Sequence, residues 1–86
     1  MPILLPNEEV SRDQLHGYTV FLWAHDHPYP RHIHVKKGRR RSGWNLDTLD
    51  CTDKGEFSSS DVREQRKILV EHREALWRSW YAYWEH

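Results

Sequence analysis

The spacing of hydrophobic residues divides the chain into two parts that meet near Phe57. Before that point, short apolar stretches are separated by Pro, Gly and polar residues, which is typical of strands and turns. Residues 18–24 (YTVFLWA) are rich in β-branched and aromatic side chains and predict a buried strand, and residues 31–37 (RHIHVKK) alternate in type and predict a second. We expect a third strand at residues 44–49 and a short edge strand in the N-terminal arm, whose prolines suit a sheet edge.

Beyond that point the apolar residues recur at helical spacing, which predicts one long amphipathic helix over residues 59–84. A serine from the triplet at 58–60 would cap its N-terminus, and Asp61 and Glu64 would place negative charge in the first turn. We therefore predict a single α+β domain over residues 1–86, in which a small antiparallel β-sheet packs against a long C-terminal α-helix.

The last turns of this helix carry more apolar surface than one sheet contact needs. A first apolar stripe faces the predicted sheet, and a second stripe widens the apolar arc to roughly half the circumference, against the roughly 100° that one contact requires. A second structural element or a partner is expected to cover the remainder. The residues that we expect at an interface with a cognate protein or in a homo-oligomer are Trp77, Tyr81 and Trp84.

Composition narrows the setting of the protein. The formal net charge is zero, so no global charge favours nucleic acid or a membrane surface. The single cysteine, Cys51, excludes an internal disulfide and a multi-cysteine zinc site, which favours a reducing cytoplasm. Because the start lacks a basic leader and the sequence lacks a run of about 18 apolar residues, we expect neither export nor a membrane span.

The charges are nevertheless unevenly distributed. Six cations and no anion fall between Arg31 and Arg41, whereas residues 44–64 carry six acids and two bases. The basic run could hold RNA phosphates beside a stacking tryptophan, or it could be a solvated hairpin turn whose charges pair with the acids that follow. The candidate nucleic-acid-binding residues are Lys36, Lys37, Arg39, Arg40, Arg41 and Trp44.

Four of the seven histidines lie in the stretch HDHPYPRHIHV, residues 25–35. On a strand, His32 and His34 project from one face about 6–7 Å apart, while the residues between and beside them take the other face. Asp26 and His27 would complete a site for a divalent transition metal as carboxylate and third imidazole. The same His32 and His34, with Asp26, are candidates for acid–base catalysis on RNA, because histidine titrates near neutral pH.

These motifs together resemble a bacterial family called domain of unknown function 4160. The matching segments are Phe21-Leu-Trp23, His32-Ile-His34-Val35, Trp44-Asn-Leu46, Gly55-Glu-Phe57-Ser58, Glu71-His-Arg-Glu74 and Trp80-Tyr-Ala-Tyr. The resemblance extends from about Tyr18 to Trp84, and the family hallmark Pro-Pro-His-hydrophobic-His-Val is filled here from Pro30 onward, with Arg31 in place of the second proline.

The resemblance implies a small bacterial protein encoded beside another short protein, in an arrangement like a toxin–antitoxin pair. Three hypotheses follow. The protein is a member of such a pair that binds a cognate protein and acts on RNA, with ribonuclease-like chemistry if it is an enzyme. Alternatively, it is a divalent-metal-binding module, or an interaction domain in which the histidines only brace the proline turn.

Overall fold

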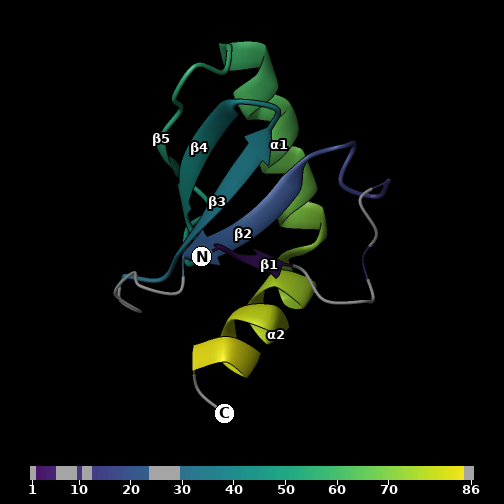
Figure 1. Ribbon diagram of the computed structural model, residues 1–86, viewed down its shortest axis with the longest axis vertical. Coiled ribbons are helices and arrows are strands. Elements are labelled where there is room, and N and C mark those ends of the chain that lie inside the picture. The colour runs from purple at the N-terminus through teal and green to yellow at the C-terminus, as the bar shows by residue number, and fades with distance from the viewer. Residues whose placement is uncertain (1, 6–9, 11–12, 24–29, 85–86) are drawn as a thin grey trace.

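The computed structural model describes residues 2–5, 10, 13–23 and 30–84 (Figure 1). Within these residues the strands come first and the helices last, so the predicted α+β class is confirmed. The elements are β1 (Pro2–Leu5), β2 (Thr19–Trp23), β3 (His32–Lys37), β4 (Arg40–Asn45), β5 (Cys51–Asp53), α1 (Ser59–Glu71) and α2 (Arg73–Trp84).

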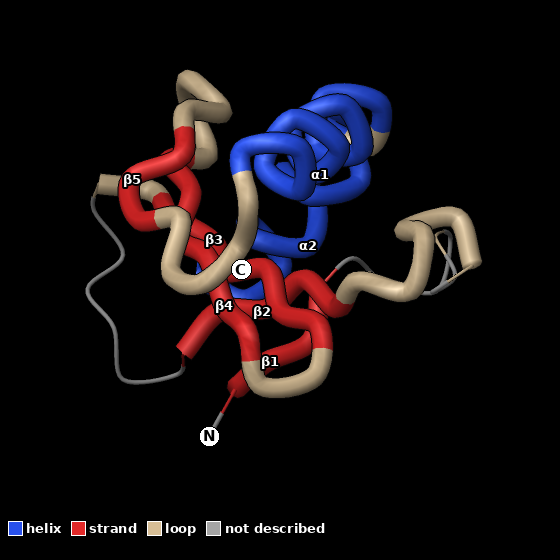
Figure 2. The backbone as a smooth tube through the Cα atoms, turned by 90° about the horizontal axis from the view of Figure 1, so that it is seen from above, coloured by secondary structure: helices blue, strands red, loops and turns tan. Residues whose placement is uncertain are grey.

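The five strands form one antiparallel sheet in the order β1-β2-β3-β4-β5, so each strand pairs with its neighbour in sequence. Both helices lie on the same side of this sheet (Figure 2). We call the helix-covered side the inner face and the opposite side the outer face. None of the helices formed by the described residues is long and apolar enough to cross a bilayer.

The core lies between the inner face and the helices. Ile33, Trp44, Leu69 and Leu76 are each at most 1% exposed, and they belong to one cluster of buried side chains. The indole N–H of Trp44 donates to Ser42 Oγ at 2.9 Å, which in turn donates to the Oε1 of a buried glutamine on α1 at 2.6 Å. These two hydrogen bonds connect buried polar groups of the sheet with α1.

Two strands follow the sequence prediction closely, whereas the third does not. β2 and β3 begin one residue later than predicted, and β1 is the expected edge strand. The strand predicted at 44–49 is wrong, because β4 begins at Arg40 and ends at Asn45. Asn45 Oδ1 accepts hydrogen bonds from the N–H groups of Asp47 at 2.8 Å and Thr48 at 2.9 Å, which turns the chain out of the strand. The short β5 was not predicted.

The prediction of one long helix over 59–84 is also wrong, because α1 and α2 are separated at His72. His72 has φ −108° and ψ 21°, outside the helical region, and its N–H reaches Ile68 O at 3.1 Å. No Gly or Pro lies near this position, so the break has no local sequence signal. Leu69 before the break and Leu76 after it are both buried, so the core contacts continue across it.

Candidate functional site

Strand pairing fixes which side chains share the outer face. In the β2–β3 and β3–β4 registers, Phe21 lies opposite His34, and Lys36 lies opposite Arg41. Since side chains alternate along a strand and Ile33 points into the core, the even-numbered residues of β3 point outward with their cross-strand partners. No helix of the described residues covers this face (Figure 2).

The two histidines share the outer face, as the alternation predicted. Their ring centroids are 5.6 Å apart and nearly perpendicular. His34 stacks on Phe21 with a centroid distance of 5.2 Å, and its ring lies steeply inclined to that of Trp23 with a centroid distance of 6.5 Å. The Nδ1 of His32 lies 2.8 Å from the carbonyl oxygen of Pro30. Because that oxygen can only accept, Nδ1 carries the proton and donates this hydrogen bond.

An aromatic cluster covers part of the outer face. Phe21 is only 2% exposed although it lies on the side without a helix and outside the main core. Trp23 contacts it edge-on at 5.5 Å, His34 stacks on it, and the Nζ of Lys36 lies 5.4 Å from its ring centroid. The guanidinium of Arg41 lies 5.9 Å from the Trp23 ring. We call Phe21, Trp23 and His34, with the cations Lys36 and Arg41, the outer cluster.

A concave pocket of about 410 Å³ opens beside the outer cluster. We call it the outer pocket. From the sheet it is lined by residues that include Phe21, Trp23, Lys36 and Arg41, and from the end of β5 and the segment that follows by Asp53, Gly55 and Glu56. Gly55 in that segment has φ +55°, and a Cβ added to it would collide with the carbonyl oxygen of Arg41. Only glycine therefore allows this segment to lie directly against β4 and close the wall of the pocket.

The predicted basic run is divided between the two faces. Lys37 and Arg40 lie opposite each other in the register and turn inward, with Lys37 Nζ 4.9 Å from the Tyr18 ring. Arg40 lies 5.2 Å from the Phe57 ring and forms an ion pair at 3.6 Å with Asp61, although it also borders the outer pocket. The remaining cations, which turn toward the outer pocket or sit in the turn beside it, are Lys36, Arg39 and Arg41.

The predicted stacking role of Trp44 is wrong, because its side chain is fully buried at 0% exposure. Trp44 lies opposite Ile33 in the register and therefore belongs to the inner face. Trp23 is the partly exposed tryptophan on the outer face, and sequence reasoning missed it. The signal was present, because Trp23 shares its parity on β2 with Phe21, the residue opposite His34.

The metal hypothesis is only partly covered by the described residues. His32 and His34 lie side by side, whereas the other predicted ligands, Asp26 and His27, lie outside the described residues, as does the catalytic candidate Asp26. Among residues 2–5, 10, 13–23 and 30–84, no group of three His, Cys, Asp or Glu side chains is close enough to hold a metal ion.

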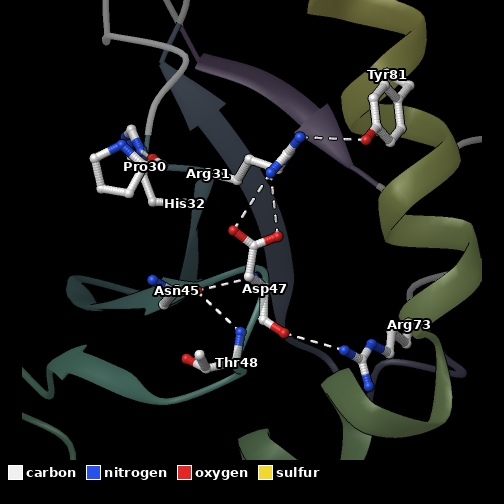
Figure 3. Close-up of polar contacts among 8 residues, drawn as sticks. All are labelled: Pro30, Arg31, His32, Asn45, Asp47, Thr48, Arg73 and Tyr81. Atoms are coloured by element: carbon white, nitrogen blue, oxygen red, sulfur yellow. Dashed lines mark hydrogen bonds and ion pairs between the residues drawn. The ribbon is translucent and has the colours of Figure 1, made fainter.

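The aromatic residues predicted at a partner interface are half-buried, and the chain itself covers part of them. Trp77 and Tyr81 stack at 5.3 Å, and Trp84 packs against a neighbouring tyrosine at 4.8 Å. The guanidinium of Arg31 donates to the Tyr81 hydroxyl at 3.4 Å and pairs with Asp47 at 3.4 Å (Figure 3). It also lies 5.0 Å from the centroid of the Trp77 ring. We call this set of contacts the Arg31 clamp.

The comparisons with known proteins give one match. A family model described as domain of unknown function (DUF4160) matches residues 17–81, a range that contains β2 to β5, α1 and most of α2. It therefore includes every residue of the outer cluster. No curated protein and no solved structure matches the chain.

Proposed function

The chain belongs to the DUF4160 family, and because that name assigns no activity, we propose from the geometry of the site that the protein binds single-stranded RNA across its outer face. The observation that carries the proposal is that Lys36 and Arg41 line one pocket with the partly exposed Trp23, on a face that no described helix covers. Single strands are commonly bound by sheet surfaces that offer cations to the phosphates and aromatic rings to the bases.

The charges of the outer pocket support this proposal. Within the part of the chain that the structure describes, Lys36, Arg39 and Arg41 form no ion pair, whereas Arg40 is paired with Asp61. Cations without a carboxylate partner gain more from a phosphate, because binding releases condensed counterions without breaking an existing pair. An RNA strand bound there would also lie beside His32 and His34, the two imidazoles available for ribonuclease-like acid–base chemistry.

The matched positions of the basic run provide a direct test. Lys36→Gln/Arg41→Gln removes two outer cations, and Lys37→Gln/Arg40→Gln removes two inner cations from the neighbouring pair of the same hairpin. We expect the outer variant to bind a labelled heptauridine at least about tenfold more weakly at low salt. Its log–log salt slope should be smaller by about 1.4, since two phosphate contacts are lost. Fluorescence anisotropy measures both quantities.

The inner variant is the control, and it should retain the affinity and the salt slope of the wild type. Its thermal unfolding must be recorded as well, because Arg40 also contacts Phe57 and Asp61. Equal losses in the two variants would show that only net charge matters. The absence of any binding at low salt would end the RNA proposal.

The proposal keeps the cognate protein that the family resemblance implies. We assign that partner to the half-buried aromatic surface of Trp77, Tyr81 and Trp84 on α2, on the opposite side of the sheet from the RNA. Trp84→Glu is the suitable probe, because Trp77 and Tyr81 hold the Arg31 clamp. Light scattering and co-expression with the neighbouring short protein should show loss of assembly with the fold retained. An unchanged monomer with no bound protein before substitution would contradict this assignment.

A divalent transition-metal site at the histidine pair is a second candidate, favoured by the hydrogen bond that His32 Nδ1 donates to Pro30 O at 2.8 Å. Metal-binding histidines commonly donate their other N–H to a backbone carbonyl, which fixes the orientation of the ring. Zinc should raise the melting temperature of the wild type and not that of His32→Ala/His34→Ala. Equal responses of the two proteins would exclude the histidine pair as ligands.

A further inference from the structure

The outer pocket contains acidic as well as basic groups. Asp53 and Glu56 line it together with Trp23 and the cations of β3 and β4. A pocket that held only phosphate would gain nothing from two carboxylates, because like charges repel. Their presence beside an aromatic ring points to a ligand that carries N–H donors as well as a phosphate.

The two carboxylates differ in their local contacts. Asp53 Oδ1 accepts a hydrogen bond from the N–H of Gly55 at 2.9 Å, so it helps to form the turn at the pocket wall. Glu56 is exposed, and among the contacts of the described residues none is an ion pair that involves it. Both oxygens of Glu56 can therefore accept hydrogen bonds from a ligand, whereas Asp53 already uses one oxygen for the backbone.

Guanine is the base that presents two adjacent donors, N1–H and N2–H₂, along its Watson–Crick edge, and these match the two oxygens of a carboxylate. Adenine and cytosine place a ring acceptor beside their amino group, and uracil places carbonyl oxygens on both sides of its N–H. Each of these arrangements would set a ligand acceptor against a carboxylate oxygen, which is unfavourable.

We infer that the outer pocket selects guanine in a bound RNA strand, with the base stacked on Trp23 and its N1–H and N2–H₂ donated to Glu56. This inference rests on the proposed function, because Lys36 and Arg41, the cations removed in the outer variant, hold the phosphate of the same nucleotide. The volume of about 410 Å³ lies in the range of small-ligand sites, roughly 300–1,000 Å³. Phe21 also lines the pocket, but at 2% exposure it is too buried to stack a base itself.

Two labelled heptamers test the inference, uridine strands that carry either a central guanosine or a central adenosine. Both purines stack well, so a difference between these strands reports hydrogen bonding rather than stacking. The wild type should prefer the guanosine strand by roughly tenfold or more, as expected for a two-point contact to a base. Glu56→Gln should reduce this ratio nearly to one, because an amide offers a donor where guanine also has one.

Asp53→Asn is the matched control in the same pocket. It removes the same charge, and its remaining carbonyl oxygen can still accept from the Gly55 N–H. Both variants should bind the adenosine strand slightly more tightly, because each loses one repulsive charge. Only Glu56→Gln should lose the preference for the guanosine heptamer over the adenosine heptamer. Glu71→Gln on α1, remote from the outer face, should change neither this preference nor the affinity for the adenosine heptamer.

The outcomes separate this inference from the RNA proposal. Equal wild-type affinity for the two heptamers, still dependent on Lys36 and Arg41, would overturn guanine selection and leave RNA binding intact. A preference lost in Asp53→Asn and kept in Glu56→Gln would overturn the assignment to Glu56. The absence of binding to either heptamer at low salt would overturn both proposals.

Discussion

The two faces of the sheet use the same strands in different ways. On the inner face, Ile33 and Trp44 are fully buried under the helices and serve the core. On the outer face, Phe21 and Trp23 gather beside cations where no described helix lies. The difference shows that residues adjacent in this sequence have unrelated roles. A candidate binding residue must therefore be chosen by its strand parity and not by its place in a charged or aromatic run.

The two tryptophans on opposite faces provide the largest contrast. Trp44→Ala should lower the free energy of unfolding by about 3–5 kcal/mol, because a fully buried indole leaves a cavity and its hydrogen-bond partner Ser42 loses a donor. Trp23→Ala, on the partly exposed outer side, should lower it by only about 1–2 kcal/mol. Urea denaturation measures both.

RNA affinity should show the opposite order in these variants. Trp23→Ala should weaken heptauridine binding roughly tenfold or more, through loss of a stacking surface. Trp44→Ala should bind normally once corrected for its folded fraction. Equal stability losses, or an RNA defect confined to Trp44→Ala, would contradict the division of roles between the faces.

Substitution of Arg31, the residue before β3, tests how much the contacts on the inner face stabilise the protein. Its side chain is 24% exposed and contacts Trp77, Tyr81 and Asp47. Arg31→Ala should lower the free energy of unfolding by about 1–3 kcal/mol, because a charged hydrogen bond and cation–π contacts are lost together. RNA affinity should not change, since the clamp lies on the inner side. Urea denaturation and anisotropy measure these two outcomes.

Arg66→Ala is the control for Arg31, because Arg66 is 60% exposed and pairs only at 4.0 Å with Asp50 among its described ion pairs. Its free energy of unfolding should change by at most about 0.5 kcal/mol. If Arg31→Ala were as mild as this control, the clamp would have no stabilising role, and Arg31 would be a surface cation near the aromatic rings of α2.

The sequence predicted those strands whose own residues strongly favour a strand. β2 and β3 were found because their apolar residues suit strands, and counting by two along β3 put His32 and His34 on one face. Trp44 was misassigned because the bounds of β4 were predicted wrongly, so the face on which its side chain lies could not be counted. With β4 at 40–45, Trp44 shares its parity with Ser42 and faces inward.

The remaining errors concern features without a local signal. The turn after Asn45 depends on one side-chain oxygen that accepts two backbone N–H groups, and the apolar pattern of residues 46–49 does not reveal that geometry. The break at His72 occurs among good helix formers with buried leucines on both sides. Tertiary packing rather than propensity sets such a break. The outer pocket depends on the approach of Gly55 to β4, which only the folded chain reveals.

Removing the N-terminal cap of α1 should change the free energy of unfolding less than Trp44→Ala or Arg31→Ala does. Ser58 accepts a hydrogen bond from the Asp61 N–H at 3.1 Å, and Asp61 accepts one from the Ser58 N–H at 3.2 Å, which forms a capping box. Ser58→Ala should lower the free energy of unfolding by about 1 kcal/mol. Ser60→Ala, an exposed position within the first turn, should have little effect, and RNA affinity should be unchanged in both. Equal effects of the two serines would contradict the cap.

The pH dependence of this cap should give the smallest change and is measured best as a difference between two curves. The backbone N–H of Ser58, followed by its hydroxyl and then by Arg40, holds the pKa of Asp61 below its usual value. A depressed carboxyl pKa means that the charged form stabilises the fold above the unfolded pKa, about 3.9, and that this contribution is lost as pH falls through the lower folded pKa. Asp61→Asn cannot ionise.

The melting temperature of Asp61→Asn should therefore lie below that of the wild type near pH 7. This gap between the two melting temperatures should close as pH falls below about 4. Thermal unfolding of the two proteins from pH 3 to pH 7 measures the gap. The contribution is modest because the side chain is 34% exposed and its pair with Arg40 is screened by solvent. A gap that stays constant across this range would show that Asp61 acts through its shape or hydrogen bonds alone. In that case the ion pair between Arg40 and Asp61 would contribute nothing to stability.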